Sequence, residues 1–321
     1  MTNVSLDHPA SPGTARRKRP FLDPRGAGWC SLFLAPMVLL YLGFVLWPTL
    51  ASLYFSLFNW DGIGWPQQFV GLENYREAAG DGLFWKAFGN TWKYTLGVVI
   101  LQVPLALLVA VALNDPTLRG RTVYRTLFFL PVVTTTAVVG VVLAVMLSPI
   151  GGAVNAALLG SGVVDRPVNF LGTVSLALPT LIAIGIWKTF GIKMIYWLAG
   201  LQSVPAELYE AARLDGATGA QILRHVTLPL LRPVALTILV LALLQSLNVF
   251  DLVRVMTAGG PLYSTDVVST YIYRLAFSAE LGVPRFGYAS AAGVIFGVTN
   301  LAIIAVQALA TRAARRKERV P

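Results

Sequence analysis

The stretch SVPAELYEAARLDGATGAQILRHVTLPLLRP, residues 203–233, is a charged and polar segment that separates two long apolar segments. The apolar segments, residues 174–199 and 234–256, both exceed the roughly 20 residues that an α-helix needs to cross a hydrocarbon core about 30 Å thick. Residues 203–233 are too polar to cross such a core and too rich in helix signals to be a plain linker. We therefore expect a structured loop between two membrane-spanning helices.

Capping signals inside this loop predict a pair of short helices. Ser203 can cap the first helix, which should end at Asp215 because a glycine follows. Thr218 followed three residues later by Gln221 is a capping-box pattern for a second helix, and this helix should end before Pro229. The apolar side of such a helix pair needs either a protein partner or, alternatively, the lipid surface to cover it.

Apolar segments recur on both sides of the loop, and together they predict an all-α integral membrane protein with six spans. Helices are expected because every backbone hydrogen bond in lipid must be made within the protein. The segment before the second span, residues 59–89, carries several charges and should lie outside the membrane. The six expected spans lie near residues 31–57, 91–113, 123–147, 174–199, 234–256 and 288–309.

The composition agrees with a membrane protein and argues against an enzyme. Of the 321 residues 56% are hydrophobic and only 12% are charged, against about 25% charged in soluble domains. Cys30 is the single cysteine, and neither His8 nor His225 belongs to a metal-ligand pattern. We therefore expect no metal site, no internal disulfide and no catalytic residues.

Basic residues accumulate in the cytoplasmic segments of membrane proteins, and here they predict that both the N and C termini are cytoplasmic. Residues 1–28 are rich in Pro and Gly and contain the run RRKR at 16–19, so they are expected to form a disordered basic tail. Residues 29–311 would form the membrane domain, and residues 312–321 a second basic tail. The net charge of +10 follows from this topology, so no nucleic-acid partner is expected.

The loop also carries a spaced motif, Glu210-Ala211-Ala212, Gly216 and Val226-Thr227-Leu228-Pro229. This pattern resembles the EAA loop of ABC importer permeases, with Val226 in place of the family's isoleucine. In that family the loop docks into a cleft of a cytoplasmic ATPase. The resemblance implies that the ATPase-coupling residues are Glu210, Ala211, Ala212, Asp215, Gly216, Leu228 and Pro229.

The likeness extends over most of the chain and is greatest to the carbohydrate uptake branch, related to maltose and glycerol-phosphate systems. The stretches that carry it include FVGLENYREA from Phe69, RTLFFLPVV from Arg125, FDLVRVMTAGGP from Phe250 and FGYASAAGVI from Phe286. The resemblance implies a type I ABC importer permease fold and a multi-pass protein of a prokaryotic inner or plasma membrane. It makes residues 29–311 the permease domain and residues 203–233 its coupling loop.

The resemblance also implies a set of partners. They would be a second permease that forms a heterodimer with this chain, a cytoplasmic ABC ATPase dimer and an extracytoplasmic solute-binding protein, all acting at a lipid membrane. The chain contains no G-x-x-x-x-G-K-[ST] phosphate loop and cannot hydrolyse ATP alone. No cofactor is therefore expected in this chain, and the partner ATPase would bind ATP and Mg.

Polar side chains within the spans are candidates for lining a solute path, because such residues are costly in lipid. In the fourth span these are Lys188 and Thr189, and in the fifth Gln245, Ser246 and Asn248. The alternative is that Lys188 snorkels or pairs between helices, and that the others hold helices together.

Two neighbouring charges have other expected roles. Lys193, nearer the cytoplasmic end of the fourth span, is expected to snorkel, and the expected partner of Asp251 is Arg254.

The leading hypothesis is the pore subunit of an ATP-driven, binding-protein-dependent importer of sugars or related polar solutes, working by alternating access. One alternative is a membrane-embedded enzyme acting on a lipid-linked sugar, which should show clustered acidic or histidine groups. Another is a secondary transporter, which would usually place carboxylates inside its spans. The sequence contains neither feature apart from Asp251 near the end of a span.

Overall fold

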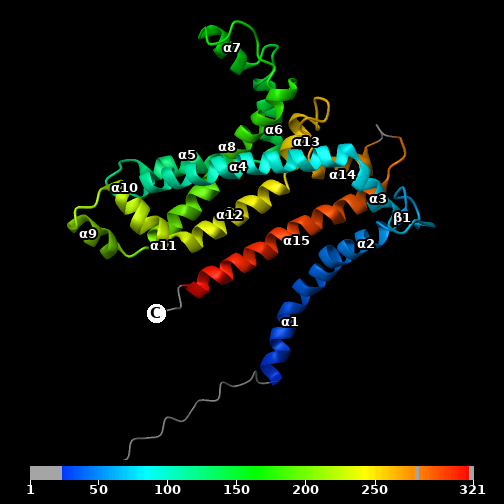
Figure 1. The fold of residues 1–321 in the computed structure, drawn as a ribbon, viewed down its shortest axis with the longest axis horizontal. Helices are drawn as coiled ribbons and strands as arrows, with labels where there is room; N and C mark the ends of the chain where they lie inside the picture. The colour runs from blue at the N-terminus through cyan, green and yellow to red at the C-terminus, as the bar shows by residue number, and fades with distance from the viewer. Residues whose placement is uncertain (1–23, 279–281, 318–321) are drawn as a thin grey trace, which may run out of the picture. The chain divides into compact units, whose positions relative to one another are not determined.

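The computed structural model describes residues 24–278 and 282–317 of the chain, and it is mainly helical (Figure 1). The chain divides into two units, one up to Ala51 and one from Ser52 onward. The first unit contains α1 (Pro24–Tyr41), a π-helical turn (Leu42–Leu46) and most of α2 (Trp47–Phe55). Helix α1 begins inside the segment expected to be a disordered tail, because Pro24 is a residue that suits a first helical turn. The rest of that tail, residues 1–23, lies outside the described residues.

Five helical segments in the described part of the chain are long and apolar enough to cross a membrane. The first, Cys30–Phe55, buries none of its most apolar window within the chain. The others include α4 (Gly82–Asn114), α8 (Val174–Gln202) and α15 (Phe286–Lys317), of which Phe286–Leu309 is the apolar part. The remaining segment, Arg232–Met256, contains α12 (Arg232–Leu247) and α13 (Asp251–Met256). All-α architecture with several spans agrees with the predicted fold class.

The third expected span, residues 123–147, is broken rather than continuous. Helix α5 (Arg121–Val133) and helix α6 (Thr136–Met146) meet at an angle of 97°, and the two count together as a possible sixth span. Pro131 lies in the last turn of α5, where it supplies no amide for the helical hydrogen bonds. Thr134 and Thr135 then adopt extended backbone conformations, so the helix ends before α6 begins.

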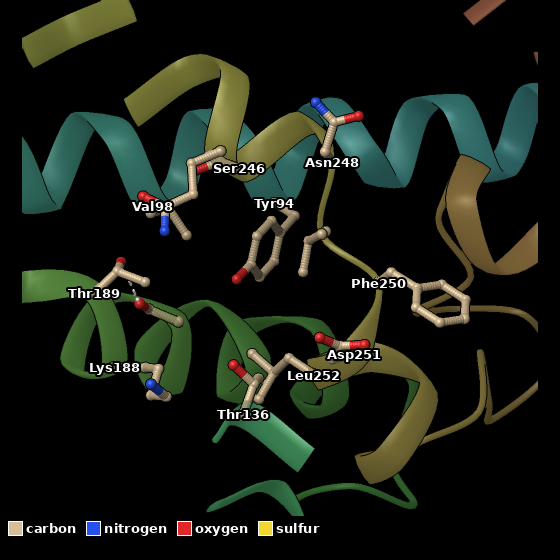
Figure 2. A pocket seen from close by; sticks show the side chains of 13 residues that line it. Tyr94, Val98, Thr136, Lys188, Thr189, Ser246, Asn248, Phe250, Asp251 and Leu252 are labelled. Carbon is tan, nitrogen blue, oxygen red and sulfur yellow. Dashed lines mark hydrogen bonds between the residues drawn. The ribbon is translucent and has the colours of Figure 1, made fainter. Parts of the chain in front are cut away.

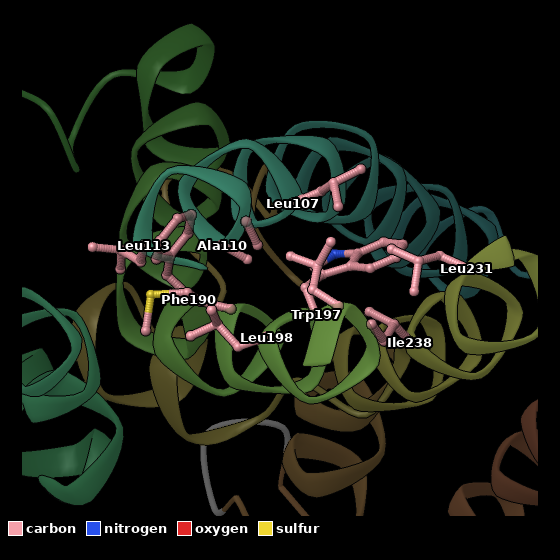
Figure 3. Packing of buried hydrophobic residues seen from close by; sticks show 11 residues of the cluster. Leu107, Ala110, Leu113, Phe190, Trp197, Leu198, Leu231 and Ile238 are labelled. Carbon is pink, nitrogen blue, oxygen red and sulfur yellow. The ribbon is translucent and has the colours of Figure 1, made fainter. Parts of the chain in front are cut away.

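Helices α4, α8 and α12 pack together around one apolar cluster (Figure 3). The indole of Trp197 on α8 lies in this cluster and donates a hydrogen bond to the Val103 carbonyl of α4, at 3.1 Å. Helix α5 also packs on α8, and a Cβ atom added at Gly191 would lie 2.4 Å from the Phe128 carbonyl oxygen of α5. A glycine at this position therefore allows close approach of the two backbones.

Residues 59–89, the segment expected outside the membrane, form a small folded region that contacts α15. It contains a two-stranded antiparallel sheet, β1 (Phe58–Asn59) and β2 (Gln68–Phe69), followed by α3 (Glu73–Gly80). The carboxylate of Glu77 on α3 makes a bidentate ion pair with Arg285 just before α15, at 2.6 and 2.8 Å. Two further short helices are α7 (Ala153–Gly160) and α14 (Val268–Phe277).

Candidate functional site

The loop between α8 and α12 contains the first predicted short helix, α9 (Ala206–Leu214). Its N-cap is Pro205, so the expected capping role of Ser203 is wrong. The Ser203 hydroxyl instead donates to the Gly200 carbonyl at 2.7 Å, because α8 runs through residue 202 and Ser203 forms its C-terminal cap. Most of the α9 surface is exposed, and the side chain of Leu214 is 89% exposed.

Gly216 makes the turn after α9 with a left-handed backbone, at φ +77°. Its amide donates to the Arg213 carbonyl at 3.0 Å, and the next amide, of Ala217, donates to the Ala212 carbonyl at 3.0 Å. These bonds satisfy carbonyls that would otherwise be left at the helix end. A left-handed conformation favours glycine, which gives a physical reason for glycine at this point of the motif.

The second predicted helix begins with the expected capping box at Thr218 and Gln221, and this prediction is confirmed. Its predicted end before Pro229 is wrong. The chain continues from α10 (Gly219–Ile222) through a π-helical turn (Leu223–Thr227) and α11 (Leu228–Leu230) towards α12.

The π-helical turn explains how the helix passes Pro229. The Leu228 amide bonds to the Leu223 carbonyl five residues back, and the Leu231 amide bonds to the Thr227 carbonyl at 2.9 Å. Such a local change of register is one way in which membrane helices accommodate proline. The Ala235 amide then bonds to the Leu231 carbonyl at 2.7 Å, which continues the hydrogen-bonded path into α12.

The residues expected to couple to an ATPase lie on the exposed part of this loop. Glu210, Ala211, Asp215 and Gly216 are exposed, as is Leu228, whereas Ala212 and Pro229 are half-buried. An exposed acidic and apolar surface at the end of a helix pair has the features of a docking surface for another protein.

At the other end of α12 lies a cavity of about 200 Å³ (Figure 2). Helices α4, α6, α8, α12 and α13, together with the turn before α13, contribute to its walls. All five residues predicted for a solute path contribute to its lining. The lining residues are Tyr94, Val98, Thr136, Gly185, Lys188, Thr189, Gln245, Ser246, Asn248, Val249, Phe250, Asp251 and Leu252.

The cavity includes polar side chains that the sequence did not single out for it. Tyr94 comes from α4, and Thr136 from the first turn of α6, just after the break in the third span. Their residue types are common in spans, and nothing in their spacing relates them to α8 or α12. Asp251 also lines the cavity, and its expected pair with Arg254 is not formed, since that guanidinium lies over the Tyr273 ring at 4.9 Å.

Hydrogen bonds to the rest of the protein orient several of the lining side chains. The Thr189 hydroxyl accepts a hydrogen bond from the Gln102 amide at 2.7 Å and donates to the Gly185 carbonyl at 2.9 Å. The Asn248 amide donates to the Leu244 carbonyl at 2.8 Å. Lys188 is buried, and its ammonium donates to backbone carbonyls of the broken third span.

The expectation that Lys193 snorkels is wrong. Its side chain is buried, with 2% exposed, and its ammonium donates to the side-chain oxygen of Gln245.

Residues 24–278 and 282–317 contain no group of three or more His, Cys, Asp or Glu side chains placed to hold a metal ion. The site is thus a cavity of hydroxyl, amide and carboxylate groups, which can bind a polar solute.

Residues 102–316 match the family described as binding-protein-dependent transport system inner membrane component. The probable ABC transporter permease protein YurN of Bacillus subtilis (strain 168) is 33% identical over 277 residues, which cover 86% of this chain and 93% of that protein. The lactose transport system permease protein LacF of Rhizobium radiobacter is 35% identical over 265 residues, covering 82% and 86%.

A solved structure is similar along nearly the whole length. It is a chain in the crystal structure of a bacterial ABC transporter involved in the import of the acidic polysaccharide alginate, with a TM-score of 0.78 and 28% identity. The similarity covers 90% of the present chain and 96% of that one.

Proposed function

Because the chain belongs to the family of binding-protein-dependent transport system inner membrane components, we propose that it carries a sugar across the membrane through the cavity between α4, α8 and α12. The family makes it a permease subunit of an ABC importer in the inner membrane and not an enzyme. The observation that carries the proposal is the gathering of hydroxyl and amide side chains from four helices around one cavity. Sugars are bound by such donors and acceptors.

The names of relatives support a carbohydrate as the solute. Relatives include the lactose permease LacF, the multiple sugar-binding transport system permease MsmF of Streptococcus mutans serotype c and the arabinooligosaccharides permease AraP of Bacillus subtilis (strain 168). The proposed contacts to the sugar are three polar residues of the cavity wall, Thr189 on α8 and Gln245 and Ser246 on α12. Asn248 lies just beyond α12. Lys188 belongs to the same wall.

We further propose that the loop at residues 203–233 couples this cavity to ATP hydrolysis in a partner. Glu210, Ala211, Asp215 and Gly216 present an exposed surface, on which a cytoplasmic ATPase dimer carrying ATP and Mg would dock. The helical path from Thr218 through α10, the π-helical turn and α11 continues into α12 and ends at the cavity. Movement of the docked loop would therefore displace residues that line the cavity.

The remaining proposed partners are a second permease, which would complete the pore as a heterodimer, and an extracytoplasmic solute-binding protein. One solved relative is the bacterial alginate ABC transporter in complex with its alginate pentasaccharide-bound periplasmic protein, which supports a partner of this kind. The apolar segment Cys30–Phe55 is long and apolar enough to cross a membrane, and it would offer surface to lipid or to the second permease.

The experiment purifies the protein from its native membrane in mild detergent, identifies the copurifying subunits and reconstitutes the complex in liposomes. Uptake of labelled neutral di- and trisaccharides is then measured with and without ATP on the ATPase side. ATP-dependent uptake of one of these sugars is the expected result. Copurification of an ATPase without uptake of any sugar would reject the carbohydrate proposal, and purification without an ATPase would reject the coupling proposal as well.

A further inference from the structure

Lys188 extends from α8 to the broken third span, where its ammonium donates to three backbone carbonyls. The Nζ atom lies 2.7 Å from the Pro131 oxygen, 2.8 Å from the Thr134 oxygen and 3.3 Å from the Val132 oxygen. Only 6% of the Lys188 residue surface is exposed. An ammonium group has three N–H donors and no acceptor, so these three contacts can use its full donor capacity.

The three carbonyls belong to the end of α5, where the helical hydrogen bonds stop. Helix α5 ends at Val133, and the last carbonyls of any helix have no partner within the helix. They also form the negative end of the helix dipole, which attracts a cation. The hydrocarbon of a bilayer contains no water to satisfy them, so an unpaired backbone carbonyl exposed to it is costly. A break of 97° in a membrane span therefore needs a donor from elsewhere in the protein.

The packing of α8 on α5 brings Lys188 to this position. Gly191 lies one turn further along α8, and its missing side chain leaves room for the Phe128 carbonyl of α5. Close approach of the two helices at this point lets the lysine reach the carbonyls beyond Pro131. The Thr134 hydroxyl donates a second hydrogen bond to the Pro131 carbonyl, at 2.7 Å, whereas the Val132 and Thr134 carbonyls receive theirs from the lysine.

From this arrangement we infer that Lys188 is a positioning residue that clamps the break between α5 and α6. The clamp fixes the direction in which α6 leaves the break, and it thereby places Thr136 at the cavity wall. Figure 2 shows Lys188 and Thr136 on the same side of the cavity. The donors of the Lys188 ammonium are directed to backbone carbonyls, so this group is not available to bind an acidic solute.

The first test uses the wild-type complex in native membrane vesicles and needs no variant. A small, membrane-permeant amine-reactive reagent is applied with and without a mixture of the neutral di- and trisaccharides used in the uptake assay, and labelled lysines are quantified by mass spectrometry. Exposed Lys86 is the labelling control. We expect at least tenfold less label on Lys188 than on Lys86, whether or not sugar is present. Strong labelling of Lys188 that sugar suppresses would make it a solute ligand and overturn the clamp.

The second test compares Lys188→Met with Lys193→Met by amide hydrogen exchange of the purified complex. Both lysines are buried on α8, but Lys193 contacts Gln245 instead of the break, so its variant is a matched control. We expect exchange of the amides in residues 130–138 to accelerate at least tenfold in Lys188→Met and to stay within twofold of wild type in Lys193→Met. Equal exchange in both variants would contradict the inference.

A third variant covers the case in which Lys188→Met does not accumulate. Lys188→Arg retains a cation with several donors, and we expect it to restore both expression and slow exchange at the break. Failure of Lys188→Arg together with a sugar-dependent label on wild-type Lys188 would reject the clamp. None of these readouts requires the ATPase-coupling proposal, so the two can fail independently.

Discussion

Lys193 on α8 and Gln245 on α12 are joined by a hydrogen bond in the interior of the protein, from the lysine ammonium to the amide oxygen. Gln245 also lines the cavity, so the buried lysine fixes the orientation of one wall side chain. Two residues 52 positions apart thus connect the fourth and fifth spans at the level of the proposed solute path.

The first prediction concerns this pair. Gln245→Leu leaves the Lys193 ammonium buried without its acceptor, and a hydrogen bond to a charged group contributes about 1.5–3 kcal/mol. We expect a clear loss of thermal stability in detergent for Gln245→Leu. The double variant Gln245→Leu with Lys193→Met should recover most of that loss, because neither polar group then remains. A double variant no more stable than Gln245→Leu would show that the pair is not the cause.

The second prediction concerns the left-handed turn at Gly216. Valine is strongly disfavoured at a positive φ, whereas asparagine is tolerated there. We expect Gly216→Val to lower ATP-driven uptake at least tenfold while the isolated permease keeps its expression, and Gly216→Asn to retain most of the uptake. The measurement is transport in liposomes alongside ATPase copurification. Equal loss in both variants would indicate that a side chain at this position blocks the partner, and that the backbone conformation is not the requirement.

The third prediction concerns glycines within spans. A Cβ atom at Gly191 would lie 2.4 Å from a backbone oxygen of α5, whereas a Cβ at Gly297 on α15 has no atom within 4 Å. Gly191→Ala should therefore destabilise the protein by about 1–3 kcal/mol through overpacking. Gly297→Ala should be neutral or slightly stabilising, because alanine is the better helix former. Thermal unfolding of the two variants in the same detergent distinguishes them, and similar midpoints would contradict the close approach.

The fourth prediction concerns Asp81, which caps α4 outside the membrane-spanning segments. Partial burial raises the pKa of its carboxyl, but hydrogen bonds from Tyr271, Tyr288 and the Leu83 amide outweigh this and leave the pKa below its usual value of 3.8. A carboxyl with a lowered folded-state pKa stabilises the protein above its unfolded-state pKa. That stability is lost as pH falls through the folded-state pKa.

We therefore expect wild type to be more stable than Asp81→Asn at neutral pH, and the difference to shrink as the pH falls below about 4. Thermal unfolding across pH 3–7 in detergent provides the measurement. Asp61, a half-buried acid in the neighbouring segment whose carboxylate, among the described residues, accepts a hydrogen bond from the Ile63 amide only, offers a control in Asp61→Asn, which should show a smaller difference. A wild-type advantage over Asp81→Asn that is constant with pH would rule out the proposed contribution of the charge.

Sequence patterns located many features that depend on neighbouring residues. The capping box at Thr218 forms as predicted because its bonds join residues only three positions apart. Helices occur in each of the six predicted spans because long apolar segments in lipid must bond within themselves. The predicted path residues Thr189 and Ser246 were identified by their polarity within apolar segments, and for Ser246 also by the family resemblance; the structure brings both to one cavity.

The errors arose where distant groups supply what the local sequence lacks. Pro229 normally predicts a helix end, yet a π-helical turn carries the chain past it. Pro131 sits in an apolar segment that looks continuous, yet the span breaks there and Lys188 of another helix satisfies the carbonyls. Lys193 was expected at the membrane surface because its acceptor, on α12, is far away in the sequence.

The sequence by itself determined that the chain is an α-helical membrane protein, where its apolar segments lie, and that the loop at residues 203–233 carries a coupling motif. The spans and the loop follow from hydropathy and capping, which act over a few residues, whereas coupling by the loop is what the resemblance of its motif implies. Only the tertiary structure decided where the third span breaks, which carbonyls Lys188 holds, and that Tyr94, Thr136 and Asp251 share a cavity with the predicted residues. The reason is that each of these depends on which backbone or side-chain groups meet across helices, and hydrophobic periodicity does not specify the partners of a buried polar group.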